Sequence, residues 1–213
     1  MRKLLMALCV VLVMTTWSAA ATPAQQFIEA YRPVTPITLS APRPAMPQGT
    51  SLRRSLSERA GQFRAQLEQN ADGHPFIDCG CSFTGEELDK MFLKEQAGYG
   101  AVYVRLQEET GVCPLWSAAV DAAESGHFVY QCAPNNVSGF GFDGKRYMSF
   151  PSVEACLEHK TRFLAEAYLT PGGLYYNGTD LSAVCKSYNG SVYWRNLVID
   201  VAYGMLARGE RAT

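Results

Sequence analysis

Signals that start and stop helices recur along this chain, and they constrain its fold more than any other feature. Thr84 and Glu87 form a Thr-x-x-Glu capping box, in which each side chain satisfies a backbone amide at a helix start. Pro114 suits the first turn of a later helix, because that turn leaves its amide hydrogens unbonded. Gly111 and Gly126 suit positions just after a helix end. These boundaries predict several short helices.

Apolar residues between these boundaries recur every three or four positions, as they do on one face of a helix. The spacing is clearest at Leu56, Ala60, Phe63 and Leu67. A loop rich in Asn, Gly and Pro, residues 131–150, contains the sequence DGKR, which predicts a short β-hairpin. The predicted fold class is therefore α+β and predominantly α-helical. We expect helices over residues 51–70, 84–97, 99–111, 115–125, 151–169 and 191–207.

The N-terminus has the pattern of a secretory signal peptide. Arg2 and Lys3 precede an apolar run from Leu4 to Met14, and the small residues SAAATPA follow. We expect cleavage after Ala21, with Ala24 as the alternative, so that residues 1–21 are the signal peptide. The alternative of an uncleaved anchor is opposed by the short apolar run, and nothing later is long enough to span a membrane. The predicted location is periplasmic or secreted.

Cysteine content agrees with export to an oxidising compartment. Cys9 leaves with the signal peptide, and an even number remains, which suggests up to three disulfides. Cys79 and Cys81 are too close in sequence to pair comfortably with each other. A zinc site is disfavoured because the chain has no CxxC motif and only three histidines. We therefore predict no metal and no cofactor. The remaining cysteines are Cys79, Cys81, Cys113, Cys132, Cys156 and Cys185.

Net charge and length narrow the class of ligand and the number of domains. The formal net charge is −1, which argues against a broad nucleic-acid-binding surface and leaves a neutral or small polar ligand open. Prolines recur from residue 22 to residue 50, and this stretch reads as an extended arm or linker. The mature length fits one domain plus this arm. Protein partners cannot be named from these features.

Glu124 is the candidate for acid chemistry. On the helix that begins at Leu115, it follows Trp116, Val120 and Ala123 on one face. Burial against this apolar stripe would disfavour the carboxylate and raise the pKa of Glu124. A carboxyl group that holds its proton near neutral pH can act as a general acid. The alternative is an ordinary exposed or capping glutamate at a helix end.

Four blocks of sequence resemble the glucosaminidase family of peptidoglycan endo-β-N-acetylglucosaminidases, which have a lysozyme-like fold. The resemblance covers residues 112–206. It implies a catalytic domain at residues 112–208, with glycan strands of peptidoglycan as the partner. We expect residues 51–111 to form N-terminal helices that pack on this domain, with a partner-binding element as the alternative. The blocks are PLWSAAVDAAESGHF, NNVSGFGFDG, YMSFPSVEACLEHKTRFL and YNGSVYWRNLVIDVAY.

The resemblance also implies roles for individual residues. Glu124 matches the general acid of the family, and Ser125 lies where the helix ends beside the substrate. Two departures weaken the match: Gly141 stands where the family often has lysine, and the late tyrosine segment is one residue shorter and lacks its Asp-Pro. The remaining matches to residues that line the sugar cleft are Asn136, Gly139, Phe140, Tyr188 and Tyr193.

A second carboxylate is harder to find. Glycoside hydrolysis usually needs one carboxyl group to protonate the leaving oxygen and another as base or nucleophile. Asp143 is the acidic residue of the short predicted hairpin, although aspartate is also an ordinary turn residue there. Glu154 lies in a first helical turn, where a negative charge is favoured in any case. The acetamido group of the substrate is a further candidate.

Three functions follow from these observations. The leading prediction is an exported peptidoglycan hydrolase that cleaves the β-1,4 bond after N-acetylglucosamine. The second is a non-catalytic glycan-binding or scaffold protein that kept the fold without the second carboxylate. The third is a lytic transglycosylase, which needs one acid and no activated water. Among the aromatic residues, we expect Phe163, Tyr168 and Trp194 to lie in the core.

Overall fold

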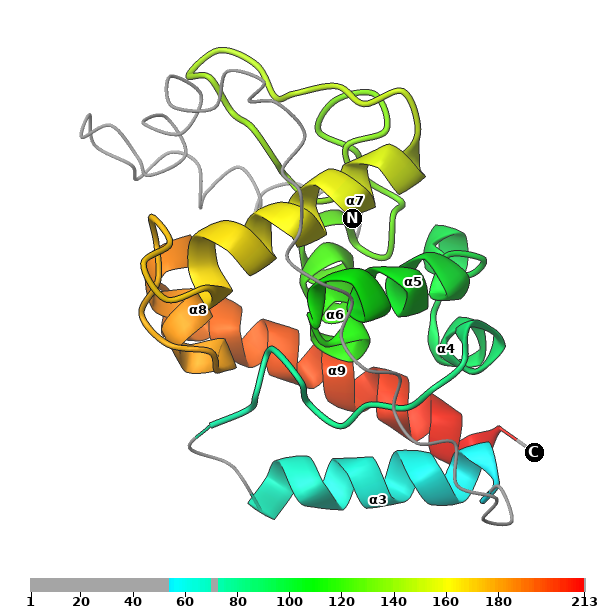
Figure 1. The fold of residues 1–213 in the computed structure, drawn as a ribbon. Coiled ribbons are helices and arrows are strands. Elements are labelled where there is room, and N and C mark those ends of the chain that lie inside the picture. The colour runs from blue at the N-terminus through cyan, green and yellow to red at the C-terminus, as the bar shows by residue number, and fades with distance from the viewer. Residues whose placement is uncertain (1–53, 70–72, 213) are drawn as a thin grey trace.

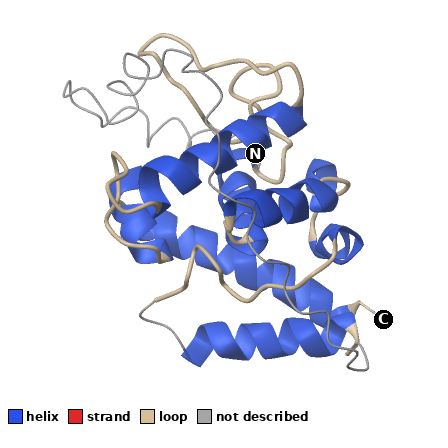
Figure 2. Cartoon of the chain, viewed as in Figure 1, coloured by secondary structure: helices blue, strands red, loops and turns tan. Residues whose placement is uncertain are grey.

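The computed structural model describes residues 54–69 and 73–212. The predicted signal peptide and the proline-rich arm lie outside these residues. The described part is built from helices and loops, and no strand is assigned within it (Figure 2). Two isolated bridges, Pro75 with Asp180 and Ile77 with Val112, are its β-type pairings. The prediction of a predominantly helical fold is confirmed.

Most helices follow the predicted boundaries closely, but the helix predicted at residues 84–97 is divided into α4 and η1. Helix α8 was not predicted, and the last predicted helix continues four residues further, to Arg211. None of the helices in the described ranges has the length and apolarity needed to cross a membrane. In chain order the elements are α3 (Leu56–Gln69), α4 (Gly85–Met91), the 3₁₀ turn η1 (Lys94–Gln96), α5 (Gly100–Thr110), α6 (Pro114–Ser125), α7 (Val153–Phe163), the π-helical turn η2 (Leu164–Leu169), α8 (Leu181–Tyr188) and α9 (Val192–Arg211).

Helix α6 lies at the centre of the molecule. It packs against α5 and α9, and α9 in turn packs against α3, α4 and α8 (Figure 1). Every residue from Pro114 to Ala122 is buried. Small side chains such as Ala118 and Ala119 allow neighbours to approach α6 from several sides, since they add little bulk to the helix. The predicted apolar residues Trp116 and Val120 are buried, and so is the opposite side of α6 from Pro114 to Ala122.

The predicted hairpin region is a hydrogen-bonded loop without assigned strands. It belongs to the long connection between α6 and α7, which lies over one side of the helices (Figure 1). The amide of Asp143 donates to the carbonyl of Arg146 at 3.0 Å, and the amide of Met148 donates to the carbonyl of Gly141 at 3.0 Å. These bonds turn the chain at DGKR, but they are too few to make a β-lobe.

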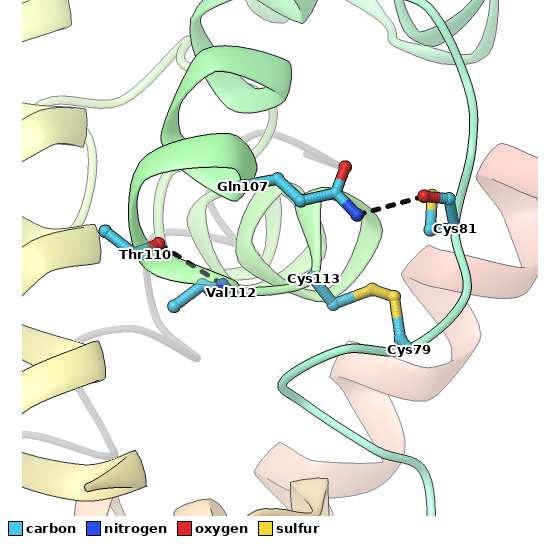
Figure 3. The surroundings of a disulfide bond; sticks show 6 residues. All are labelled: Cys79, Cys81, Gln107, Thr110, Val112 and Cys113. Carbon is cyan, nitrogen blue, oxygen red and sulfur yellow. Dashed lines mark hydrogen bonds between the residues drawn. A yellow bond between two sulfur atoms is a disulfide. The ribbon is translucent and has the colours of Figure 1, made fainter. Parts of the chain in front are cut away.

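One disulfide joins Cys79 to Cys113, at the residue that precedes α6 (Figure 3). Cys81 does not pair with Cys79. This agrees with the prediction that the two cysteines are too close in sequence to form a disulfide. One disulfide lies within the expectation of up to three, and the other cysteines of the described part are unpaired. Three of these, Cys81, Cys156 and Cys185, are buried among core residues.

Candidate functional site

Glu124 occupies the last turn of α6, where the helix reaches the surface. Gly126 ends the helix with a left-handed backbone (φ 60°), and its amide donates to the carbonyl of Ala122. Residues 114–122 and Ser125 are buried, whereas Glu124 is exposed. Its predicted burial against Trp116 and Val120 is therefore wrong. The side chain leaves the core at the helix end and meets groups from other elements there.

Trp194 on α9 makes a direct contact with the acid. Its indole Nε1–H donates to Oε1 of Glu124 at 2.8 Å. The indole is 8% exposed, as expected of a core residue. Its ring also stacks on Tyr188 of α8, with ring centroids 5.0 Å apart and an interplanar angle of 23°. Trp194 thus has a polar role beside its packing role, and the hydrogen bond to Glu124 was not predicted from the sequence.

The α6–α7 loop approaches the other oxygen of the carboxyl. Gly139 has a left-handed backbone (φ +61°), and a Cβ atom there would lie 3.2 Å from Oε2 of Glu124. The preceding carbonyl, that of Ser138, lies 3.5 Å from the hydroxyl of Tyr188, which donates to it. Glu124 is therefore approached by side chains from α8 and α9 and by loop backbone, even though solvent still reaches it.

These surroundings raise the pKa of Glu124 to about 7. Desolvation by neighbouring protein atoms is the largest cause, because it disfavours the charged carboxylate. The hydrogen bond from Trp194 acts in the opposite direction, the negative charge of Asp121 raises the pKa, and Lys160 lowers it. Near neutral pH the carboxyl group is thus divided between its protonated and charged forms. That is the state required of a general acid.

Three of the predicted substrate-binding residues bond or pack against other groups of the protein itself. The side chain of Asn136 bonds the backbone of its own loop, donating to the carbonyls of Phe140 (2.8 Å) and Met148 (2.7 Å). The ring of Phe140 packs in the core, with its centroid 5.4 Å from that of Phe163. Ser125 is buried, and its hydroxyl donates to the carbonyl of Asp121 at 2.6 Å. These residues support the loop and helix end rather than presenting a surface to a sugar.

The two late tyrosines differ in position. Tyr188 is half-buried beside Trp194, and burial raises the pKa of its phenol well above the ordinary value, with the charge of Glu124 adding to the rise. It therefore remains a neutral hydrogen-bond donor at neutral pH. Tyr193 is 76% exposed at the first turn of α9, next to Trp194. Its ring is available for contact with a ligand.

Asp143 has the role of a turn residue. Its Oδ1 accepts hydrogen bonds from the amides of Lys145 and Arg146, each at 2.8 Å. These bonds hold the pKa of Asp143 below its ordinary value. A carboxylate that is already stabilised in this way is a weak base. The structure thus favours the alternative that the sequence left open, in which Asp143 shapes the turn.

Other titratable groups surround Glu124 or lie near it in sequence. The charge of Glu124 contributes to the raised pKa values of Tyr147 and Cys132, after the larger effect of burial, so both side chains are within its electrostatic reach. Burial raises the pKa of Cys132 to about 11, which keeps the thiol protonated. His127 contacts the side chain of Gln96 at 3.0 Å, which fixes the imidazole at the helix end.

Two other features of the described residues lie apart from this site. The sulfur atoms of Cys79, Cys81 and Cys113 lie within 4.8 Å of one another, but two of them form the disulfide. A hollow of about 430 Å³ is lined by the start of α3 and the two residues before it, by Glu87 and Lys90 of α4, and by Ala212. It shares no lining residue with the contacts of Glu124. Neither feature contributes a group that contacts Glu124.

Two charged groups beneath the acid were not predicted from the sequence. Asp121 and Lys160 are both buried, on α6 and α7, and they form an ion pair of 2.9 Å. One signal was present, because Asp121 interrupts a run of small and apolar residues in a helix with a predicted apolar face. No family model and no curated protein matches the chain. The glucosaminidase resemblance therefore rests on the four sequence blocks.

Proposed function

We propose that this protein is an exported peptidoglycan hydrolase with a lysozyme-like fold, which cleaves the β-1,4 bond after N-acetylglucosamine. The observation that carries the proposal is the Glu124 carboxyl, whose pKa is raised to about 7 at a solvent-reachable helix end. The four sequence blocks support the choice of substrate. The surface aromatic Tyr193 supports it further, since tyrosine offers a sugar both an apolar face and a hydroxyl.

In this mechanism the protonated Glu124 donates its proton to the glycosidic oxygen as the bond to the sugar carbon breaks. The proton transfer leaves a carboxylate on Glu124. The indole N–H of Trp194, 2.8 Å from Oε1, stabilises that negative charge. The indole N–H of Trp194 thus favours the carboxylate that forms when Glu124 gives up its proton. The neighbouring protein atoms favour the protonated acid that exists before this step.

The fate of the sugar cation distinguishes the proposal from its nearest alternative. A hydrolase adds water, which is usually activated by a second carboxylate. Asp143 is held in a turn and is a weak base, and this observation favours a second candidate function, that of a lytic transglycosylase. In that reaction a hydroxyl of the substrate attacks the cation in place of water, and an anhydro sugar forms. A non-catalytic glycan-binding protein is the remaining alternative.

Digestion of purified peptidoglycan by the mature, disulfide-intact protein tests the function, with mass spectrometry of the released fragments. Hydrolysis gives fragments with reducing N-acetylglucosamine ends. Fragments with anhydro ends, which are lighter by one water, would show that the protein is a lytic transglycosylase and not a hydrolase. Binding to peptidoglycan without any released fragment would show that the protein is a non-catalytic glycan-binding protein. The Asp143→Asn variant, run in parallel, keeps its activity if the carboxylate serves the turn alone.

A further inference from the structure

Asp121 lies beneath the site, one helical turn before Glu124, and its carboxylate is fully bonded although it is buried. Its Oδ2 accepts from the hydroxyl of Tyr103 on α5 at 2.8 Å and pairs with the ammonium of Lys160 on α7 at 2.9 Å. Its Oδ1 accepts from the hydroxyl of Ser138 on the α6–α7 loop at 2.6 Å. One side chain therefore links α6 to two other helices and to the loop that faces Glu124.

The ammonium group of Lys160 is also fully hydrogen-bonded. Besides Asp121, its Nζ donates to the carbonyl of Ser117 at 3.1 Å and to the Ser117 hydroxyl at 2.9 Å. These contacts use the three hydrogens of the ammonium group. A buried ion pair adds little net stability, because removing both charges from water costs about as much as their attraction returns. The helices could pack through apolar side chains instead, so stability alone does not account for the pair.

Apolar side chains would not replace the bonds that Asp121 accepts from Tyr103 and Ser138, and the second of these reaches the loop. The chain continues from Ser138 to Gly139, whose Cα–H faces the Glu124 carboxyl with little room to spare. Tyr188 donates to the carbonyl of the same Ser138 from the other side, at 3.5 Å. Ser138 is thus held by Asp121 through its side chain and by Tyr188 through its backbone. Movement of Ser138 would move the backbone that keeps water from one side of Glu124.

We propose that Asp121, paired with Lys160, is a positioning residue that acts through Ser138 to hold the Ser138–Gly139 backbone against the Glu124 carboxyl. The proposal depends on the proposed role of Glu124 as an acid. Asp121 touches neither the substrate nor the reacting proton. It fixes the distance between the loop and the acid, and this distance determines how strongly the carboxyl is desolvated.

The groups that face Glu124 come from every surrounding element. Asp121 and Lys160 bring opposite charges, and their effects on the pKa of Glu124 oppose each other. Tyr188, Tyr147 and Cys132 have raised pKa values and remain neutral near pH 7. Trp194 contributes a neutral N–H. Because a neutral variant of Ser138 leaves both charges in place, the position of the loop is the influence that it changes.

The Ser138→Ala variant tests this proposal, because it removes the bond to Asp121 and keeps both charges of the pair. Thr161→Val is the matched control: the Thr161 hydroxyl lies 3.3 Å from that of Ser117, on the side of the network away from the loop. The readout is the ¹³C NMR titration of the Glu124 carboxyl carbon, identified by its absence in Glu124→Gln. Both variants are studied as the mature protein with its disulfide.

We expect Ser138→Ala to lower the titration midpoint of Glu124 by roughly one pH unit, since water gains access to the carboxyl. Glycan cleavage falls about tenfold, because the acid is no longer held in place. Thr161→Val changes neither property. The same midpoint in Ser138→Ala as in Thr161→Val would overturn the proposal. The titration needs no substrate, so it decides the role of Asp121 even if the wild type cleaves no glycan.

Discussion

Two influences on the Glu124 carboxyl oppose each other at the residue scale. Desolvation raises its pKa, and the N–H of Trp194 lowers it. Without the first, the residue would have lost its proton at neutral pH, as ordinary glutamates do. Without the second, the carboxylate formed by proton transfer would lack a donor close to Oε1. A pKa of about 7 is the result of both, and each can be changed separately.

Replacing Trp194 with phenylalanine removes the N–H and keeps most of the ring. Because this N–H stabilises the charged form, its loss raises the pKa of Glu124 above about 7. Glu124 then keeps its proton to higher pH, and the alkaline limb of the pH–rate profile for glycan cleavage moves up by about one pH unit. The pH–rate profile and the NMR titration of Glu124 both measure this shift.

Trp116→Phe is the control for the loss of a buried indole. Trp116 is fully buried in α6, and its Nε1 has no hydrogen-bond partner. In this variant Glu124 should titrate with the same midpoint as in the wild type. Equal shifts in the two variants would show that general loosening of the core, and not the hydrogen bond from Trp194, sets the proton affinity.

At the scale of elements, helix boundaries were predictable because local chemistry decides them. Thr84 and Glu87 form the predicted capping box at the start of α4. Pro114 occupies the first turn of α6, and Gly126 ends it with a left-handed backbone. The start and end of the helix that carries Glu124 could therefore be predicted from the sequence, and so could the direction in which the pKa of Glu124 moves.

The remaining parts of the site depend on contacts between distant residues. Asp121 and Lys160 lie on different helices, and no pattern in either helix indicates that they pair. Helix α8 was missed because it is short and begins at an aspartate cap after a loop rich in glycine. Trp194 reaches Glu124 across 70 positions of sequence. Periodicity along one helix predicts which faces are buried, but it does not predict which polar atoms meet there.

The α6–α7 loop gives an element-scale prediction through Gly139→Ala. The left-handed backbone at Gly139 disfavours any Cβ atom, which costs about 1 kcal/mol of stability. The new Cβ would also lie 3.2 Å from Oε2 of Glu124, so that either the loop or the acid must move. We expect glycan cleavage to fall at least tenfold, on the order of the effect of small displacements in other catalytic sites.

Gly172→Ala separates backbone strain from contact with the acid. Gly172 also has a left-handed backbone (φ +88°), but a Cβ atom there meets nothing within 4 Å. Chemical denaturation should show similar losses of stability in the two alanine variants, and only Gly139→Ala should lose activity. If Gly172→Ala lost as much activity per folded molecule, the contact between Gly139 and Glu124 would have no special role.

On the scale of the whole molecule, the two ends of α6 are fixed by different means. Cys113, just before the helix, is bonded to Cys79 in the segment that follows α3. The far end carries Glu124 and contacts Trp194 of α9. Helix α9 also packs against α3, so α3, α9 and the disulfide form a continuous support for the central helix (Figure 1). The geometry of the site thus depends on the fold as a whole.

The Cys113→Ser variant tests the contribution of the disulfide, because it leaves Cys79 and Cys81, which are too close in sequence to bridge comfortably. A bond that closes a loop of 34 residues stabilises a protein by about 4 kcal/mol through the unfolded chain. Urea unfolding should show a loss of that order. Cys185→Ser, a variant of an unpaired buried cysteine, should lose about 1 kcal/mol. Unfolding of Cys113→Ser at the wild-type urea concentration would contradict the account.

The most direct test of the central claim is the rate of peptidoglycan cleavage by Glu124→Gln compared with the wild type. Glutamine keeps the shape of the side chain and its contact with Trp194 but has no acidic proton. Glu86→Gln makes the same chemical change at an exposed position in the first turn of α4. The account predicts a loss of at least about 100-fold for Glu124→Gln and wild-type activity for Glu86→Gln. Cleavage by Glu124→Gln at the wild-type rate would show that another group donates the proton.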